Sequence, residues 1–508
     1  MNYPFWDTGI GYGWLMALVA VLHVFVSHFA IGGGLYLVLT ERWARRANDT
    51  FRLEFLQRLS KFFVLTTVVF GALSGVGIWF VIGLLNPAAT EALIHHFVWG
   101  WATEWTFFVV EIMAALLYMY GWNRMSPKNH MILGWIYFVA AWLSLFIING
   151  IITFMLTPGK WLTTGNFWDG FFNPTAMPSL VFRTGVCIML AGVYAILVAS
   201  RYKPDDAKGK LIRYNAKWAI LGLLIMAPSF YWYWKAIPAQ IITAAETFMR
   251  IPMQAVHNSF WMAGIIALIV VVFGMLIPKK FGFVLAIILM ILGLGYFGEF
   301  EWFRESLRKP YIISGYMYGN GAEVASAVTY QNDGYLAHMA YRTGDDGADL
   351  FRRSCRSCHT LNGARPLKPA FDGTDTTFII SIIKGANILR GNMPPFMGTA
   401  QEASKLGNYL FTQMDHRSIS EIYGLQGAAL GKKEYDLRCG KCHVMGGYKD
   451  NTAALAGQSD ADYNNMLDNA ADLGDGMPPF TGDSSERAAL IDYFKTLKTG
   501  GSNATSGL

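Results

Sequence analysis

Two short stretches, Cys355-Arg-Ser-Cys358-His359 and Cys439-Gly-Lys-Cys442-His443, decide how the outer part of this 508-residue chain folds. Both have the pattern C-x-x-C-H, which is the signature for covalent attachment of a c-type haem. In such a site the two thiols bond to the macrocycle, and the adjacent histidine becomes an axial ligand of the iron. The stretches therefore predict haem attachment at Cys355, Cys358, Cys439 and Cys442, and iron ligation by His359 and His443.

A methionine follows each motif at the same distance, within the sequence Met-Pro-Pro-Phe. These residues, Met393 and Met477, come 34 residues after the two histidines. A thioether on the second face of the iron raises the reduction potential, which suits electron transfer. The 84-residue spacing of the motifs also relates Tyr409 to Tyr493, and repetition on this scale indicates two copies of one small domain. We place these class I-like cytochrome c domains at residues 347–420 and 421–498.

A single C-x-x-C-H could also be a zinc-ligand pair or a redox dithiol, but its repetition with a methionine at fixed spacing favours haem. The fifth cysteine, Cys187, lies in an apolar run and is expected to be a buried small hydrophobic residue. Attachment of haem c requires the oxidising side of a membrane. Residues from about 312 onward are therefore expected outside the cytoplasm.

The composition indicates a polytopic membrane protein, because 53% of the residues are hydrophobic and only 15% are charged. Eight apolar runs before residue 306 are long enough to cross a bilayer. They lie roughly at residues 11–40, 62–85, 98–122, 131–156, 180–200, 216–234, 256–277 and 281–303. We therefore expect an all-α protein with a membrane helix bundle of about eight spans. Its segments are the bundle at 1–311, a linker at 312–346, the two cytochrome c domains, and a disordered tail at 499–508.

Basic residues predict the orientation of the bundle. Sixteen lysines and arginines follow the odd-numbered spans, against three in the alternate loops. Positive loops stay in the cytoplasm, so the N-terminus and the C-terminus are both expected outside. This is the side that the haem motifs require, and in a bacterium it is the periplasmic side of the inner membrane. The first span lacks a basic leader and a cleavage site, so it is expected to be an uncleaved helix. The basic charge belongs to the membrane part and does not indicate nucleic-acid binding.

Several ionisable residues fall inside the predicted spans, where each charge costs roughly 2.5–3.5 kcal/mol. His23 and His28 are about 140° apart around the first helix, so one could be an iron ligand and the other a hydrogen-bonded core residue. Glu104 and Glu111 are seven residues apart and share one helix face. They suit a proton route or an iron contact, or alternatively a hydrogen-bonded pair at a helix interface.

The ordered set of membrane residues resembles subunit I of the cytochrome bd-type oxidases over about residues 10–311. The resemblance is carried by Ala-Val-Leu-His23-Val-Phe-Val with Gly32 and Glu41, by Glu111 with Gly121-Trp122-Asn-Arg124, by Asn173-Pro174, and by Glu299, Trp302, Phe303, Glu305, Arg308 and Pro310. It implies that His23 and Glu305 bind the irons of two high-spin haems, of type b, d or both. It also implies that Glu111, and Glu104 one residue out of register, deliver protons or contact an iron weakly.

The chain departs from this family in several places. Phe182 and Arg183 stand where the family has the histidine ligand of its low-spin haem, and Phe260 stands where it has the partner methionine. The quinol-binding loop is reduced to about residues 235–254, and the ninth helix is missing. His257 lies nearby but offers no convincing replacement pair. These departures resemble divergent bd-like oxidases that carry fused haem c domains.

The sequence thus predicts a membrane-bound terminal oxidase subunit that takes electrons through two c-type haems and reduces O2 at a high-spin haem. The implied partners are a second bd-like membrane subunit, a soluble periplasmic cytochrome c or similar donor, O2 and the lipid bilayer. Three alternatives stay open. They are a cytochrome between the quinone pool and a periplasmic carrier, a reductase of another small molecule such as NO, and a non-catalytic anchoring or electron-wire subunit.

Overall fold

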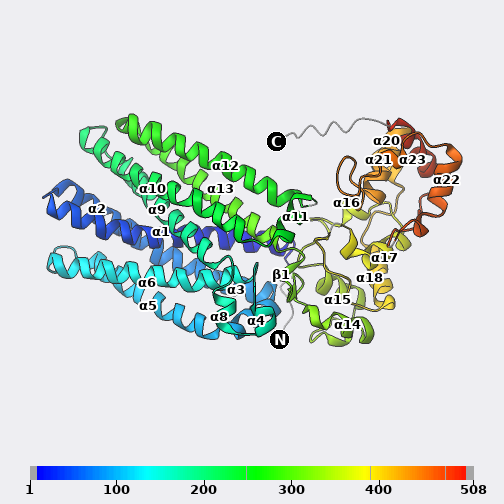
Figure 1. The fold of residues 1–508 in the computed structure, drawn as a ribbon, viewed down its shortest axis with the longest axis horizontal. Coiled ribbons are helices and arrows are strands. Elements are labelled where there is room, and N and C mark those ends of the chain that lie inside the picture. Colours follow the sequence, from blue (N-terminus) through cyan, green and yellow to red (C-terminus); the bar gives the residue numbers. More distant parts are fainter. Residues whose placement is uncertain (1–7, 248, 390, 475, 499–508) are drawn as a thin grey trace.

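The computed structural model describes residues 8–498 apart from residues 248, 390 and 475, so the predicted tail at 499–508 lies outside the described residues. A bundle of long helices forms one end of the molecule, and a smaller all-helical part forms the other (Figure 1). Within the described chain, seven helices are long and apolar enough to cross a membrane. An eighth, α10, qualifies only together with α11, from which it is bent by 99°. The eight helices agree with the eight predicted runs.

The membrane bundle contains long helices and short connecting ones. The long ones are α1 (Tyr12–Arg46), α2 (Thr50–Val64) continued by η1 (Leu65–Gly71) and α3 (Ala72–Leu85), α5 (Val98–Gly121), α6 (Pro127–Phe154), α9 (Ala176–Ala199), α10 (Asp206–Ala236), α12 (Arg250–Ile269) continued by η2 (Val270–Leu276), and α13 (Phe283–Leu307). The short ones are α4 (Pro87–His96), α7 (Trp161–Thr164), α8 (Phe167–Phe171), α11 (Ala239–Thr247) and η3 (Pro278–Lys280).

Capping residues fix the helix starts at the end of the bundle that lies away from the small helical part (Figure 1). Asp49 accepts the Arg52 N–H at 3.0 Å to start α2, and Asp205 accepts the Lys208 N–H at 2.8 Å to start α10. Such caps satisfy N–H groups that the helix itself leaves unpaired. The same turns carry the clusters of lysine and arginine, so this end of the bundle is the polar, basic one.

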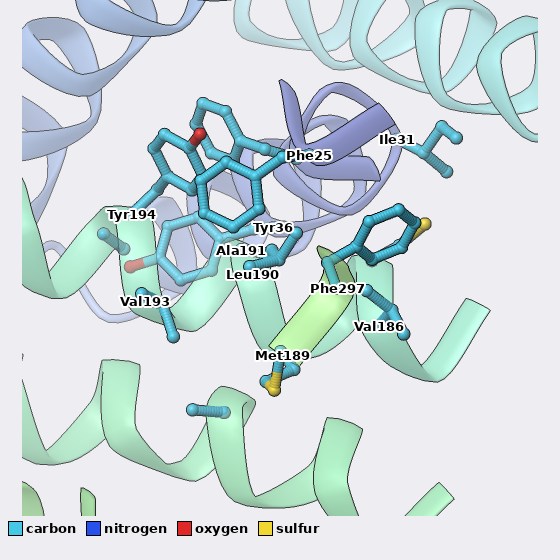
Figure 2. Close-up of a cluster of buried hydrophobic side chains, with 14 of the residues drawn as sticks. Phe25, Ile31, Tyr36, Val186, Met189, Leu190, Ala191, Val193, Tyr194 and Phe297 are labelled. Atoms are coloured by element: carbon cyan, nitrogen blue, oxygen red, sulfur yellow. The ribbon is translucent and has the colours of Figure 1, made fainter. Parts of the chain in front are cut away.

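The core of the bundle forms around α9, of which 78% of the spanning window is buried. Gly32 of α1 lies against the Cys187 backbone, and a side chain at this glycine would collide with it. This close approach brings the rings of Phe29 and Tyr194 into a stack with centroids 3.8 Å apart. Figure 2 shows this cluster, with Tyr194 beside Phe25. Cys187 is 1% exposed, which confirms the prediction of a buried apolar residue.

The residues after α13 first form a small ordered connection. Strands β1 (Tyr311–Ile313) and β2 (Met317–Tyr318) pair antiparallel and are followed by η4 (Val324–Ser326), α14 (Ala327–Asp333) and η5 (Leu336–His338). Tyr335 and Leu336 donate their N–H groups to the Glu402 carboxylate, each at 2.8 Å, and both side chains join the core of the next domain. The segment expected to be a linker is therefore packed onto the helical region that follows it.

The outer helices occur as two similar sets. The first has α15 (Asp346–Ser354), α16 (Lys368–Phe371), α17 (Thr376–Lys384), η6 (Ala386–Ile388) and α18 (Ala400–Thr412). The second begins with α19 (Ile419–Tyr423) and has α20 (Gly427–Glu434), η7 (Tyr435–Cys439), α21 (Thr452–Leu455), α22 (Asp460–Asp468), η8 (Ala470–Asp472) and α23 (Ser484–Thr496).

The two sets repeat contacts as well as elements at the 84-residue spacing. Gly347 lies against Tyr409, and Gly431 lies against Tyr493, at positions where a side chain on the glycine would collide. A capping box starts α18 at Thr399 and another starts α23 at the equivalent Asp483. Only a glycine lets α15 cross α18, and α20 cross α23, this closely. The duplication seen in the sequence is therefore also present in the packing of the helices.

Candidate functional site

The two C-x-x-C-H stretches have the same local geometry. In each, the backbone N–H of the histidine donates to the carbonyl of the first cysteine, at 2.8 Å in both copies. All five cysteines of the chain lie among the described residues, and each is free of disulfide bonds. Burial raises the pKa of Cys355 and of Cys439 to about 12, so both remain neutral thiols at physiological pH. A pair of thiols outside any disulfide and next to a histidine fits covalent haem attachment.

Each histidine of these motifs is oriented by the backbone six residues further on. His359 Nδ1 donates to the Arg365 carbonyl at 3.0 Å, and His443 Nδ1 donates to the Lys449 carbonyl at 2.8 Å. A proton on Nδ1 leaves Nε2 unprotonated, which is the form that binds a metal. Burial lowers the pKa of His359, which further favours the neutral ring. The ligand set therefore fits a c-type haem in both copies.

The first motif sits directly on the end of the membrane bundle. Gly319 donates its N–H to the Pro310 carbonyl at 2.9 Å, just beyond α13, and a Cβ on this glycine would lie 3.9 Å from Cys358 Sγ. Arg356, within the motif, donates to the Thr8 carbonyl at 2.8 Å. The first C-x-x-C-H stretch thus contacts both Thr8, before α1, and the segment that follows α13.

The second motif packs on the first cytochrome c region. Lys441 Nζ donates to the Ala370 carbonyl at 2.7 Å and lies 5.1 Å from the centroid of the Phe371 ring. Cys442 packs against the core cluster of the first region. The second motif is therefore carried outside the first, further from the membrane bundle (Figure 1).

His23 faces the second span. Its Nδ1 lies 3.1 Å from Ser74 Oγ, and a Cβ on Gly75 would lie 3.1 Å from His23 Cε1. Ser74 gives its own proton to the Phe70 carbonyl at 2.7 Å, so its oxygen accepts the proton of His23 Nδ1. Nε2 is then left as a possible ligand atom, which fits the role that the family resemblance gives to His23.

His28, on the same helix, is fully engaged with the protein. Its Nδ1 donates to the Val24 carbonyl at 2.8 Å, and its Nε2 lies 3.5 Å from Arg183 Nη1. Since both ring nitrogens face protein groups, His28 matches the alternative of a hydrogen-bonded core histidine.

The two carboxylates of α5 differ in their surroundings. Glu104 accepts the Ser144 hydroxyl at 2.9 Å, which ties it to α6. Glu111 lies two turns further along the same helix and is half-buried. The two residues share a face, as the sequence predicts, and Ser144 joins them as a third polar group in this part of the bundle.

The outer end of α13 is a cluster of charges. Glu305 is 41% exposed and pairs with Arg308 and with Lys309, whose Nζ lies 2.8 Å from the carboxylate. Arg308 is nearly buried and also donates to the Ile312 carbonyl at 3.1 Å. The carboxylate of Glu305 would have to give up one of these partners to reach an iron.

Arg183 forms the centre of a buried ion cluster. Its Nη2 donates to Glu301 at 2.8 Å, and Arg304 donates to the other oxygen of the same carboxylate at 2.7 Å. Arg183 is 2% exposed. A guanidinium paired in this way carries no lone pair for an iron, and neither does Phe182, the other residue expected at the position of the family's haem histidine.

Two contacts of the candidate residues were not predicted from the sequence. Ser74, which lies between Gly71 and Gly75 in the second span, orients His23. A polar residue inside an apolar run was the available signal. Lys441, the third residue of the second motif, bonds to Ala370 and so links the two outer sets of helices; nothing in the sequence alone distinguishes this contact.

Known proteins share both parts of the chain. Residues 13–233 match the family model of cytochrome bd terminal oxidase subunit I, and residues 342–410 match that of cytochrome c oxidase, cbb3-type, subunit III. Among solved structures, the bd oxidase from Geobacillus thermodenitrificans matches with a TM-score of 0.52 and 17% identity, over 62% of this chain and 90% of that one. A comparison with curated proteins gives no match.

The helical bundle with its haem motifs defines a membrane oxidoreductase that handles electrons through haem. The resemblance to subunit I of the cytochrome bd-type oxidases is confirmed, and the chain is a bd-oxidase-like membrane subunit that carries a cytochrome c domain. Its role is therefore that of a membrane oxidase or an electron-transfer protein.

Proposed function

We propose that this subunit takes electrons through two c-type haems and reduces O2 to water at a high-spin haem inside the membrane bundle. The observation that carries the proposal is the position of the first C-x-x-C-H stretch, which packs against the end of the membrane bundle. Cys358 lies beside Gly319, which bonds to the Pro310 carbonyl just beyond α13, and the candidate ligand Glu305 lies in the last turn of α13. Electron entry and the membrane site are thus joined within one short segment.

The haems, when bound, supply electron transfer and oxygen activation, and the protein holds and orients them. The four cysteines of the two motifs would hold the covalent haems, with His359, Met393, His443 and Met477 as iron ligands. His23, oriented by Ser74, would bind one membrane haem, and Glu305 would bind the other. The ion pair of Arg183 with Glu301 supports two membrane haems, because no ligand is left at the position of a third.

Proton supply would fall to α5. Glu104 and Glu111 lie on the face that α5 turns towards α6, and the Ser144 hydroxyl is bonded to Glu104. Carboxylates held in an apolar bundle can bind and release protons near neutral pH, as a proton route requires. They would carry protons from the basic end of the bundle.

We also propose the topology and the assembly. The cytochrome c domains and the N-terminal segment lie at one end of the bundle, and the lysine-rich and arginine-rich turns lie at the other (Figure 1). By the positive-inside rule this supports periplasmic cytochrome c domains on a bacterial inner membrane. A second bd-like membrane subunit and a soluble cytochrome c are the expected partners.

Oxygen uptake by the purified, detergent-solubilised protein tests the proposal. Reduced cytochrome c should support uptake and quinol should not, because the loop expected to bind quinol is short. Uptake with quinol alone would favour a conventional bd-type donor, and reduction of the c haems without oxygen uptake would contradict the oxidase proposal.

Replacing either candidate methionine ligand is expected to lower the potential of one c haem. Met393→Ala and Met477→Ala each remove a thioether that stabilises the reduced iron. The midpoint potential of one haem should fall by on the order of 0.1 V, a part of the ~0.8 V range that axial ligands span. Spectroelectrochemical titration measures this shift, with Met397→Ala, a buried core residue of the first region, as the control. Unchanged potentials in both variants would exclude these ligands.

A further inference from the structure

The two cytochrome c regions are stacked head to tail. We call the C-x-x-C-H stretch of each domain, together with the residues packed next to it, the front face. In the second domain the front face includes Arg438, Lys441 and Gly476. We call the surface around α16, the start of α17 and the loop after it the rear face. In the first domain the rear face is residues 370–378 and 385–389, and in the second domain the equivalent residues are 454–462 and 469–473.

The front face of the second domain covers the rear face of the first. Lys441 bonds to the Ala370 carbonyl, and Arg438 lies 3.8 Å from the Asp375 carboxylate and 5.5 Å from the centroid of the Phe378 ring. At the other edge, a side chain on Gly476 would collide with Ile388. The contact joins basic groups of the front face to an acidic and aromatic rear face.

The front face of the first domain is covered in turn by the membrane end of the molecule, through Cys358 beside Gly319 and through Arg356 on the Thr8 carbonyl. Each front face therefore meets the module that comes before it. The stack has one end left, which is the rear face of the second domain.

Equivalent residues show that this last face is open. Leu389 of the first domain is 6% exposed, whereas its counterpart Leu473 is 56% exposed. Gly385 is buried and its counterpart Asn469 is exposed. The leucine four residues before the candidate methionine ligand is thus buried in the first domain and exposed in the second.

The open face is acidic. It carries Asp460, Asp462 and Asp472 and no basic residue, with Asp468 next to it, whereas the covered rear face of the first domain carries Asp372 and Asp375. Asp460 pairs with Lys495 and Asp468 pairs with Arg487. Residues 421–498 hold twelve acidic and eight basic residues, against five and nine in residues 347–420. The outer domain is therefore acidic and the inner one basic.

We propose that a soluble c-type cytochrome with lysines and arginines around its haem edge docks on the rear face of the second domain. It would take the place that a third copy of the repeat would occupy, with its basic rim on Asp472 and an apolar contact on Leu473. Charge complementarity of this kind raises association rates by steering. The inference rests on the proposed function, since it names the surface through which that function receives its donor.

Charge reversal at one aspartate tests the surface in the full-length protein. The probe is a lysine-rich cytochrome c, used with iron for stopped-flow reduction of the c haems and with redox-inert zinc for binding. Asp472→Lys should slow reduction and weaken binding of the zinc form about tenfold or more at low ionic strength. The matched control is Asp492→Lys, the same charge change at an exposed position of the same domain whose counterpart Asn408 is also exposed. It should change either quantity less than about threefold, and high salt should remove the difference.

Equal effects of the two substitutions, or no effect of Asp472→Lys, would overturn the docking surface. The oxidase proposal is measured separately, by oxygen uptake with ascorbate and a small mediator that needs no docking. Loss of that activity with retained dependence of zinc-cytochrome binding on Asp472 would refute the proposed function and keep the surface. Normal mediator-driven uptake with binding independent of Asp472 would refute the surface alone.

Discussion

Replacing Cys439 and Cys442 together by serine is expected to halve the covalently bound haem, from two per chain to one. Both thiols lie within one turn beside His443, whose ring is fixed by the Lys449 carbonyl. Serine cannot form the thioether bonds, so the second haem would be lost. The first covalent haem should be retained, because its own C-x-x-C-H stretch packs against the membrane end of the molecule.

The pyridine haemochrome spectrum at the c-type wavelength, with in-gel haem staining, measures this content. Cys355→Ser with Cys358→Ser should remove the other covalent haem, and Cys187→Ser should leave both, since Cys187 is buried inside the membrane bundle. Two covalent haems in either double variant would show that these motifs do not attach haem.

Replacing His23 by alanine is expected to remove one of two non-covalent haems and to leave both covalent ones. Ser74 holds the His23 ring so that Nε2 is the free nitrogen, and alanine offers no replacement ligand. Ser74→Ala should weaken retention of the same haem by about 10–100-fold, the usual effect of losing a residue that orients a ligand. Haem extracted with acidified acetone measures the non-covalent content.

His28→Gln is the matched control, because His28 lies on the same helix but both of its ring nitrogens face protein groups, the Val24 carbonyl and Arg183. It should keep two non-covalent haems. Equal haem loss in His23→Ala and His28→Gln would indicate general unfolding of the bundle, and full retention in His23→Ala would exclude it as a ligand.

The sequence was sufficient for the architecture because the decisive signals are local. Apolar runs, basic loops and C-x-x-C-H stretches each act through composition or short spacing, and the structure has the expected helices in the expected order. The duplication was visible for the same reason, since Gly347 and Gly431 contact equivalent tyrosines within each copy.

Contacts between distant parts of the chain could not be predicted in this way. The pairing of Arg183 with Glu301 joins residues 118 positions apart, and the bond from Lys441 to Ala370 joins two domains. Neither has a periodic or motif-like signal, because each depends on how whole modules pack. The segment 312–346 is a further example of an unpredicted distant contact. Its Gly-rich composition predicts a linker, but Tyr335 and Leu336 donate hydrogen bonds to Glu402.

An oxidase needs a haem inside the membrane bundle that is open to a gaseous ligand, whereas the c haems would be closed by His/Met ligation. The direct test is a carbon monoxide difference spectrum of the reduced, purified protein with full haem content. We expect a carbon monoxide-reactive haem in the wild-type protein and in the variant that lacks the second covalent haem. Absence of any carbon monoxide response in the wild-type protein would mean that every iron is six-coordinate, and the subunit would then be an electron conduit and not an oxidase.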